Sequence, residues 1–545
     1  MPLAFAAAVV LLVSSAILAF IWWRCKSEPP DSRVGDDHPL SRWSSNSSNS
    51  HFLVTETQDL KLGGTLAYSW HGTFFAGTIK WPGSTWKAHF NLLPSLLRPE
   101  EAEAIKSILA DAQDEFDEDR DGVDEMITYE FIILSAGAAK SWDPFRKQLR
   151  QKLLDITLPI IQSRIEPFVR KRYPEARTVC HSMVRRYLHN ERRTHGTHWD
   201  IPSFVSVVVS LDSAGKEFDG GFFVSTGTGL HSFIPLQQGD TVIHQGDLLH
   251  GVHVLRGNRW SWAMWFQDTP DCSSDPAGWW KDEAEGGDPV AQTLRAMRAR
   301  NHAQAWKWVE AAARSGFPRA LVYFGKAHQE GWNGQSKDLL KAAHWYRQAR
   351  TAGDVDAAFY LGRVEREWGN TSGATALFKE GAEKGDPKAM EEVAALYVHG
   401  TSGAPRNLDL ATHWFQQAAD FTIEAMYQTH GLYAKGTESR TADHDMAALY
   451  LKRAAAMGHL QAMREVVEPL LRAKKWEEAI PWLLRLESGP PIAKFVDLYQ
   501  QGVRIKPFAL FRGQQILQAF ADQGELGAKH LLTKLQSTAL PRAEL

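Results

Sequence analysis

The second half of this sequence repeats one short pattern, a glycine followed four residues later by an alanine. Seven units carry both residues: Gly287/Ala291, Gly316/Ala320, Gly353/Ala357, Gly385/Ala389, Gly458/Ala462, Gly489/Ala493 and Gly524/Ala528. One further unit keeps Ala425 but has Phe421 in place of the glycine, and the alanines then recur every 29 to 37 residues. Because stacked pairs of helices have this period, the pattern predicts an all-α αα-solenoid over residues 284–540.

Alanine-rich segments of helical character lie between these turns. An aromatic residue or leucine recurs before each turn, as in AWKWVEAAARSG and ATALFKEGAEKG. Small alanines allow helices to pack closely, while the larger side chains fill the layer between neighbouring repeats. These units resemble Sel-one-like repeats, a subclass of the tetratricopeptide family. The resemblance implies an array that binds another protein, and the sequence does not identify this partner.

The N-terminus, MPLAFAAAVVLLVSSAILAFIWW, has no charged side chain before Arg24. About 20 apolar residues suffice to span a bilayer. A cleaved signal peptide is the alternative, but it would have a shorter apolar stretch and a basic start, which this sequence lacks. We therefore predict a single-pass transmembrane helix over residues 1–23, followed by a flexible stalk over residues 24–50 that is rich in Pro, Ser, Asp and Asn.

The orientation of this anchor stays open. Arg24 and Lys26 follow the apolar stretch and favour a cytoplasmic body. Glycosylation sequons at Asn46 and Asn370 favour a lumenal one. We expect the endoplasmic reticulum or secretory pathway, with a lumenal catalytic domain.

Composition narrows the class of protein. The chain has 545 residues, of which 44% are hydrophobic and 23% charged, which is typical of several globular domains. A formal net charge of -3 gives no reason to expect nucleic acid as a partner. Three cysteines exclude a disulfide scaffold; Cys180 and Cys272 could form one bridge, but we favour two unrelated thiols.

Residues 51–270 predict a second, α+β domain. Strand-like segments up to residue 87 form an N-terminal extension, and helical spacing of apolar residues follows near 96–113 and 145–173. Short β-rich runs come next, such as FVSVVVSLD, GGFFVSTG and WSWAMWF, with glycine-rich turns between them. A series of short strands of this kind predicts a sandwich or barrel.

The stretch THGTHWD, residues 194–200, contains a candidate pair of metal ligands. Residues i and i+2 of a strand face the same side, so His198 and Asp200 are expected to point together at one ion, with Trp199 packed behind. Three residues separate His195 from His198. Strand alternation therefore predicts that His195 faces the other side and lies at the rim.

A third ligand would come from GDTVIHQGDLLHGVHVLRGNRWSWAMWF, which offers His244, His250 and His253. Two histidines and one carboxylate with open positions form the facial triad of non-haem Fe(II) oxygenases. Those enzymes also need a cation for the distal carboxylate of their co-substrate, and arginine binds carboxylate in a bidentate manner.

The motif His198-Trp-Asp200, followed by His250 and then by Arg259-Trp-Ser, resembles the Fe(II)/2-oxoglutarate dioxygenases of the prolyl 4-hydroxylase type. The resemblance covers about residues 88–270. In that family the distal histidine precedes the 2-oxoglutarate arginine by nine or ten residues. This spacing selects His250, which lies nine residues before Arg259.

The resemblance implies a double-stranded β-helix, or jelly roll, in which the two histidines and the aspartate hold Fe(II). It implies that Arg259 binds the distal carboxylate of 2-oxoglutarate, assisted by Ser261, and that Tyr187 lines the pocket, although a core tyrosine is an equal alternative. Ascorbate is implied as a helper that re-reduces the metal.

The implied activity is hydroxylation of a prolyl or lysyl residue in a protein or peptide substrate, coupled to oxidative decarboxylation of 2-oxoglutarate, by a membrane-anchored enzyme. Two alternatives stay open. One is a repeat-based adaptor whose oxygenase domain is catalytically silent, and the other is the same chemistry on a non-protein substrate.

An acidic segment precedes the β-rich region. Its sequence, Asp117-x-Asp119-x-Asp121-Gly122, matches the start of a calcium loop. Position twelve of that loop requires a bidentate glutamate, and Thr128 stands there instead. We therefore predict an acidic, solvated loop without calcium.

Overall fold

The computed structural model describes residues 58–537, apart from residues 61–63, 71–74, 81–86, 122–125, 136–143, 202, 226–230, 270–271, 273–277, 300, 333, 401–403, 487–488, 504, 506 and 524.

Two antiparallel sheets form the centre of the molecule, and consecutive strands largely alternate between them. The larger sheet is built around β7 (Thr178–Tyr187), β9 (Val205–Ser210), β12 (Thr241–Gln245) and β14 (Arg259–Gln267). The smaller sheet contains β8 (Thr194–His198), β10 (Phe218–Ser225), β11 (His231–Phe233) and β13 (His250–Gly257). The orders β12-β9-β14-β7 and β11-β10-β13-β8 are those of a jelly roll.

Local sequence explains the strands at the centre. β9 reads VSVVVS, and Val205, Val207 and Val209 are fully buried. β-Branched residues fit a pleated strand well. Because β9 is covered on both faces, its sequence contains only valine and serine and does not alternate between apolar and charged residues.

The segments before β7 enlarge this domain. Four strands continue the larger sheet beyond β12: β1 (Gln58–Leu60), β2 (Gly64–Trp70), β3 (Phe75–Lys80) and β4 (Lys87–Leu93). At the other edge lie β5 (Asp117–Arg120) and β6 (Ile127–Ser135). The helical segments are α3 (Pro99–Ala110), η1 (Gln113–Glu115), α4 (Pro144–Ile160), the π-helix η3 (Ile161–Ile165) and α5 (Glu166–Arg172).

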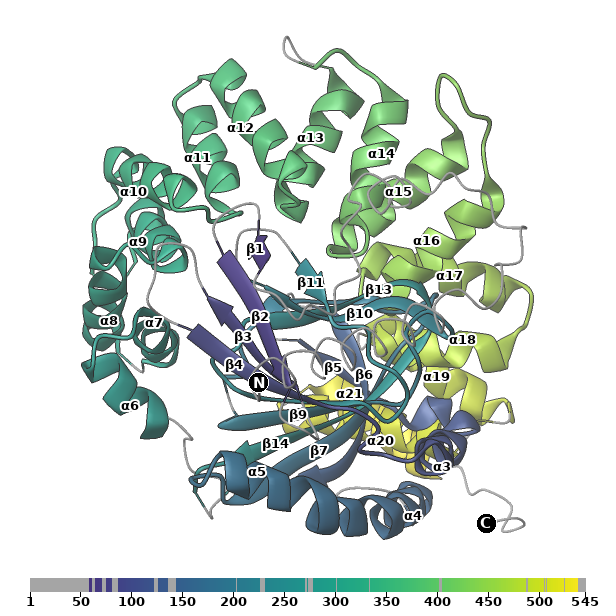
Figure 1. Ribbon diagram of the computed structural model, residues 1–545. Coiled ribbons are helices and arrows are strands. Elements are labelled where there is room, and N and C mark those ends of the chain that lie inside the picture. Colours follow the sequence, from purple (N-terminus) through teal and green to yellow (C-terminus); the bar gives the residue numbers. More distant parts are fainter. Residues whose placement is uncertain are drawn as a thin grey trace.

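The second half of the chain is helical and forms an arc around the sheets (Figure 1). Its helices are α6 (Gly278–Glu285), α7 (Pro289–Arg298), α8 (His302–Arg314), α9 (Pro318–Glu330), α10 (Leu339–Thr351), α11 (Ala357–Glu367), α12 (Thr371–Glu383), α13 (Pro387–His399), α14 (Leu408–Ala418), α15 (Ile423–Lys435), α16 (His444–Ala456), α17 (Leu460–Arg472), α18 (Trp476–Arg485), α19 (Gly489–Gln500), α20 (Pro507–Asp522) and α21 (Leu526–Ser537).

The glycines of the repeat have a backbone reason. Gly316, Gly353, Gly385 and Gly458 follow the ends of helices and have φ between 79° and 100°. Only glycine adopts this left-handed conformation without strain, so it ends one helix and turns the chain into the next. The alanines that follow four residues later are buried where the next helix packs, as at Ala389 with 0% exposure.

The fold class that included a transmembrane helix is corrected. No helix in the described part of the chain is long and apolar enough to cross a bilayer. The hydrocarbon core of a bilayer needs about 20 apolar residues in one helix, and α4 has 17 residues interrupted by lysine and arginine. The same finding contradicts the predicted localisation as a single-pass membrane protein. The residues assigned to the anchor, 1–23, and to the stalk, 24–50, lie outside the described residues.

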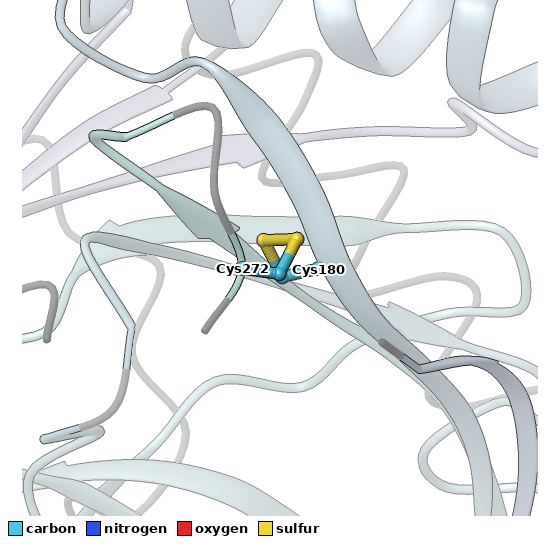
Figure 2. The surroundings of a disulfide bond; sticks show 2 residues. All are labelled: Cys180 and Cys272. Carbon is cyan, nitrogen blue, oxygen red and sulfur yellow. A yellow bond between two sulfur atoms is a disulfide. The ribbon is translucent and has the colours of Figure 1, made fainter. Parts of the chain in front are cut away.

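The preference for two unrelated thiols is also corrected. Cys180 in β7 and Cys272, beyond β14, form a disulfide with their Cα atoms 5.3 Å apart (Figure 2). The two residues are 92 positions apart in sequence. Pairing at that separation depends on how β7 and β14 lie side by side, which spacing alone does not reveal.

The acidic segment is a strand and not a solvated loop. Asp117–Arg120 forms β5, which pairs with β6 at the edge of the larger sheet. Asp117 makes a bidentate ion pair with Arg146. Asp121 lies with its Oδ2 2.9 Å from Nε2 of His195. These carboxylates thus take part in the packing of the β domain.

Candidate active site

Three of the predicted site residues meet at the ends of two strands of the smaller sheet. His198 in β8 lies directly opposite His250 in β13, and Asp200 lies in the turn after β8. His198 Nε2 is 3.5 Å from Asp200 Oδ1, and His250 Nε2 is 3.6 Å from Asp200 Oδ2. Each residue offers a ligand atom within 4.8 Å of the others, as a divalent metal site requires.

The backbone orients both imidazoles. Nδ1 of His198 lies 2.7 Å from the carbonyl oxygen of Gly196, and Nδ1 of His250 lies 3.0 Å from that of Leu248. A carbonyl oxygen only accepts, so each Nδ1 carries the proton and donates it. Each Nε2 therefore keeps its lone pair, which is the form in which histidine binds a metal.

Charge at the site suits a cation. Burial alone would raise the pKa of Asp200, but the neighbouring His250 and His198 hold this pKa well below its usual value. Burial likewise lowers the pKa of His250 well below its usual value, although the carboxylate of Asp200 opposes this effect. The group thus presents two imidazoles and one carboxylate, a ligand set for a divalent ion.

The other two candidate histidines occupy different places. His244 in β12 is fully buried and its Nε2 lies 3.9 Å from Asp200 Oδ2, so it borders the site without joining the group of three. His253 is three residues from His250 on β13 and faces the opposite side of the strand. Its Nε2 lies 3.2 Å from Asp420 Oδ2 of the solenoid.

The prediction for His195 is wrong. Its ring is buried and stacks on the ring of His198, with the centroids 3.9 Å apart and the planes 8° apart. The pairing of β8 with β13 shifts by one residue between His250 and Val252, so β8 contains a bulge here. An extra residue in one strand reverses the alternation, which places residues three apart on the same face.

Arg259, the first residue of β14, is fully buried, and none of its guanidinium nitrogens has a hydrogen-bond partner in the part of the chain that the structure describes. Tyr187 lies directly opposite it on β7. The Cζ of Arg259 is 5.9 Å from the ring centre of Tyr187 and 5.7 Å from that of Phe218. These two rings form a small buried cluster with Val252 and Val254.

This cluster and the candidate metal ligands share one interior face. His250, Val252 and Val254 alternate along β13 and so point to the same side. Ser261 lies two residues after Arg259 on β14 and is 3% exposed, which places it on the face of Arg259. Sequence reasoning missed Phe218, which no motif marks.

The comparisons with known proteins divide along the chain. The model of the Sel1 repeat matches residues 296–317, 318–354, 387–420 and 424–459, which confirms the predicted repeats. Sel1 repeats therefore occur between residues 296 and 459 of this chain. Among curated proteins, "Chitin synthase regulatory factor 3" of Schizosaccharomyces pombe is 30% identical over 137 residues. That match covers 24% of this chain and 13% of the relative's length.

Solved structures of repeat proteins and of oxygenases each match part of this chain, at low TM-scores. A protective antigen with an SLR fold from uropathogenic Escherichia coli is 20% identical, covers 48% of this chain and 59% of its own, and has a TM-score of 0.33. A 2OG-Fe(II) oxygenase family protein from Burkholderia pseudomallei is 18% identical, with 33% of this chain and 84% of that chain covered, and has a TM-score of 0.25. A prolyl-4-hydroxylase from Pseudomonas putida is 15% identical, with 32% of this chain and 91% of that chain covered, and has a TM-score of 0.22. The chemistry of the site therefore rests on its own residues.

Proposed function

We propose that this chain is an Fe(II)- and 2-oxoglutarate-dependent hydroxylase. The observation that carries the proposal is the buried guanidinium of Arg259, which has no hydrogen-bond partner among the described residues and lies on the interior face that also holds His250. A buried, unpaired charge costs several kcal/mol, so a site of this kind needs an anion to complete it. A carboxylate matches the planar fork of arginine best.

The residues present fit both groups. His198, Asp200 and His250 would hold Fe(II) on one face and leave positions open for ligands. Arg259 would bind the distal carboxylate of 2-oxoglutarate, with Ser261 on the same strand face and Tyr187 opposite.

When bound, the metal would bring together O₂, which is the oxidant, and 2-oxoglutarate, which supplies two electrons and leaves as succinate and CO₂; one oxygen atom of O₂ goes to succinate and the other to the hydroxylated C–H bond. The chain itself supplies orientation and a dry interior. Phe222 stacks on the ring of His250 with centroids 5.2 Å apart, and Val252 and Val254 cluster with the two rings that flank Arg259. These apolar side chains exclude water from the ligands. Ascorbate would serve as the external reductant that keeps the metal reduced.

We propose a protein or peptide as the substrate, with a prolyl or lysyl side chain as the hydroxylated group. Support comes from the Sel1 repeats, since helical repeat arrays present extended surfaces to other proteins. A non-protein substrate is the alternative under the same chemistry.

A second candidate function is a regulatory adaptor. It is favoured by the match to a protein named a chitin synthase regulatory factor, which is 30% identical over 137 residues. Anaerobic titration with Fe(II) and 2-oxoglutarate separates the two functions. A hydroxylase should develop a visible charge-transfer band, while a silent oxygenase domain should not.

Turnover of 2-oxoglutarate to succinate by the full chain tests the main proposal. His198→Ala and Asp200→Ala should each lower Fe(II)-dependent turnover by at least about 100-fold, because an open ligand position weakens metal binding. His344→Ala, on the exposed face of α10, is the matched control and should keep full turnover. Undiminished turnover in both site variants would refute the metal assignment.

A further inference from the structure

One turn of the solenoid contacts the two strands that carry the candidate metal ligands. This docking turn, Asp420–Thr422, connects α14 to α15. The hydroxyl of Thr194 in β8 donates a hydrogen bond to the carbonyl oxygen of Asp420. On β13, His253 Nε2 lies 3.2 Å from Asp420 Oδ2, and the ring of His253 packs edge-on against Phe421 at 4.9 Å.

The carboxylate of Asp420 is buried and carries its charge. Arg453 of the solenoid lies 2.6 Å from its Oδ1, and Arg193, next to β8, lies 3.9 Å from its Oδ2. Burial alone would raise the pKa of Asp420, but these guanidiniums and the hydrogen bond from His253 hold the pKa well below its usual value. The docking turn is therefore an ionic contact between both halves of the molecule.

The contacted residues form a pair in the same ladder as the metal ligands. Thr194 lies opposite His253, and His198 lies opposite His250. The first pair faces the solenoid, while the second faces the interior between the sheets. A contact that fixes the outer pair therefore fixes the register and spacing of the inner pair.

The docking turn is also where the repeat departs from its own pattern. Phe421 occupies the place of Gly385 in the preceding unit. Apart from glycines, only Ser95 and Lys474 have positive φ among the described residues, so Phe421 lacks the left-handed turn. Lys384, which aligns with Asp420, bonds to Glu380 of its own helix instead. The altered turn thus carries two side chains, Asp420 and Phe421, that reach the β domain.

We propose that the docking turn is a positioning element of the candidate active site, holding β8 and β13 so that His198 and His250 meet at the metal. This inference rests on the proposed function for its metal, and it makes the repeat array a part of the site's framework as well as a surface for partners. Asp420 and Phe421 are positioning residues because they act through the two strands.

Metal affinity and strand protection test this role in the full chain. Co(II) titration, followed by its visible absorption, should show about ten- to hundred-fold weaker binding in Phe421→Gly and Asp420→Ala, as for other supporting residues around a metal. Amide hydrogen exchange in β8 and β13 should accelerate in the same variants. Asp420→Asn, which keeps an oxygen acceptor for His253, should lose less than Asp420→Ala.

Lys384→Ala, at the equivalent turn one repeat earlier, is the matched control and should change neither measurement. Phe421→Gly restores the glycine of the other repeats, so it remains informative if Asp420→Ala does not fold. Wild-type Co(II) affinity and wild-type exchange in Phe421→Gly would overturn the inference. If the unaltered chain binds no Co(II), the proposed function fails, and the exchange of β8 and β13 still decides the role of the docking turn.

Discussion

Two arginines, one in each half of the molecule, differ in what surrounds their charge. Arg319 in α9 lies 2.6 Å from a carboxylate oxygen of Asp356 and 3.3 Å from one of Asp354. Arg259 in β14 is fully buried between rings, and no protein group bonds its guanidinium in the described chain. Arg319 is thus satisfied by two carboxylates of its own half of the molecule. Arg259 has no such partner among the described residues, and we propose that a ligand supplies one.

Replacing Arg259 should have the largest effect, and it should change stability and ligand binding in opposite directions. In Arg259→Met, the apolar side chain removes an unpaired buried charge, so the ligand-free protein should unfold at equal or higher denaturant concentration. Binding of 2-oxoglutarate should weaken by about 2–5 kcal/mol, because the carboxylate loses its buried partner. Urea unfolding and calorimetric titration of 2-oxoglutarate measure the two effects.

Arg319→Met is the matched control for this comparison. It leaves Asp354 and Asp356 without their cation, so it should destabilise the solenoid by about 3–5 kcal/mol while 2-oxoglutarate binding stays unchanged. The contrast between the halves breaks down if Arg259→Met is the more destabilised of the two.

Removing the disulfide should weaken the β domain alone. Cys180→Ser with Cys272→Ser opens a link across 92 residues, and loss of such a link costs about 2–5 kcal/mol. Hydrogen exchange should therefore rise in β7 and β14, with little change in α9 to α13. A reducing agent should reproduce this effect in the native protein and add nothing in the double variant.

Close packing in the solenoid predicts a smaller, local effect. A Cβ added at Gly362 would lie 2.7 Å from the ring of Phe378, so Gly362→Ala should destabilise the array by about 1–3 kcal/mol. Gly431→Ala is the control within the same array. Its Cβ meets no atom within 4 Å, so this change should stabilise α15 by up to about 1 kcal/mol. Thermal unfolding of both variants checks the two signs.

The smallest expected effect is an opposite response to pH. Burial lowers the pKa of His231 to about 3, so below its usual 6.5 only the unfolded chain takes up the proton and the β domain loses stability. Burial, with Asp356 nearby, raises the pKa of Asp386 to about 8. The folded solenoid then keeps a proton that the unfolded chain releases above pH 4, so it gains stability on acidification.

Between pH 7 and 6, each region should therefore shift by about 1 kcal/mol in opposite directions. Limited proteolysis mapped to β10–β11 and to α12–α13 measures the two regions separately. Parallel shifts would mean that the halves unfold as one unit.

Much of the fold was predictable because it depends on local patterns. The repeat follows from left-handed glycines and buried alanines that recur at a fixed spacing, as at Gly385 and Ala389. The grouping of His198 with Asp200 follows from two residues that stand close in sequence. His250 needed a family resemblance, since spacing alone left three histidines open.

Other features were not predictable because they depend on contacts between distant segments. The bulge in β8 reversed the expected orientation of His195, and nothing in THGTHWD marks an extra residue. Cys180 and Cys272 pair only because β7 and β14 are neighbours. The predicted membrane helix has no counterpart among the described helices.

The sequence by itself determined the solenoid, the β-rich region and the residue types of the site, because periodicity and residue chemistry are local properties. It also showed that Phe421 breaks the repeat, without giving a reason. Only the tertiary structure supplied this reason, since Phe421 packs against His253 on the strand of His250. Only the folded chain buries Arg259 away from every protein acceptor in the described residues, because burial depends on neighbours from β7 and β10.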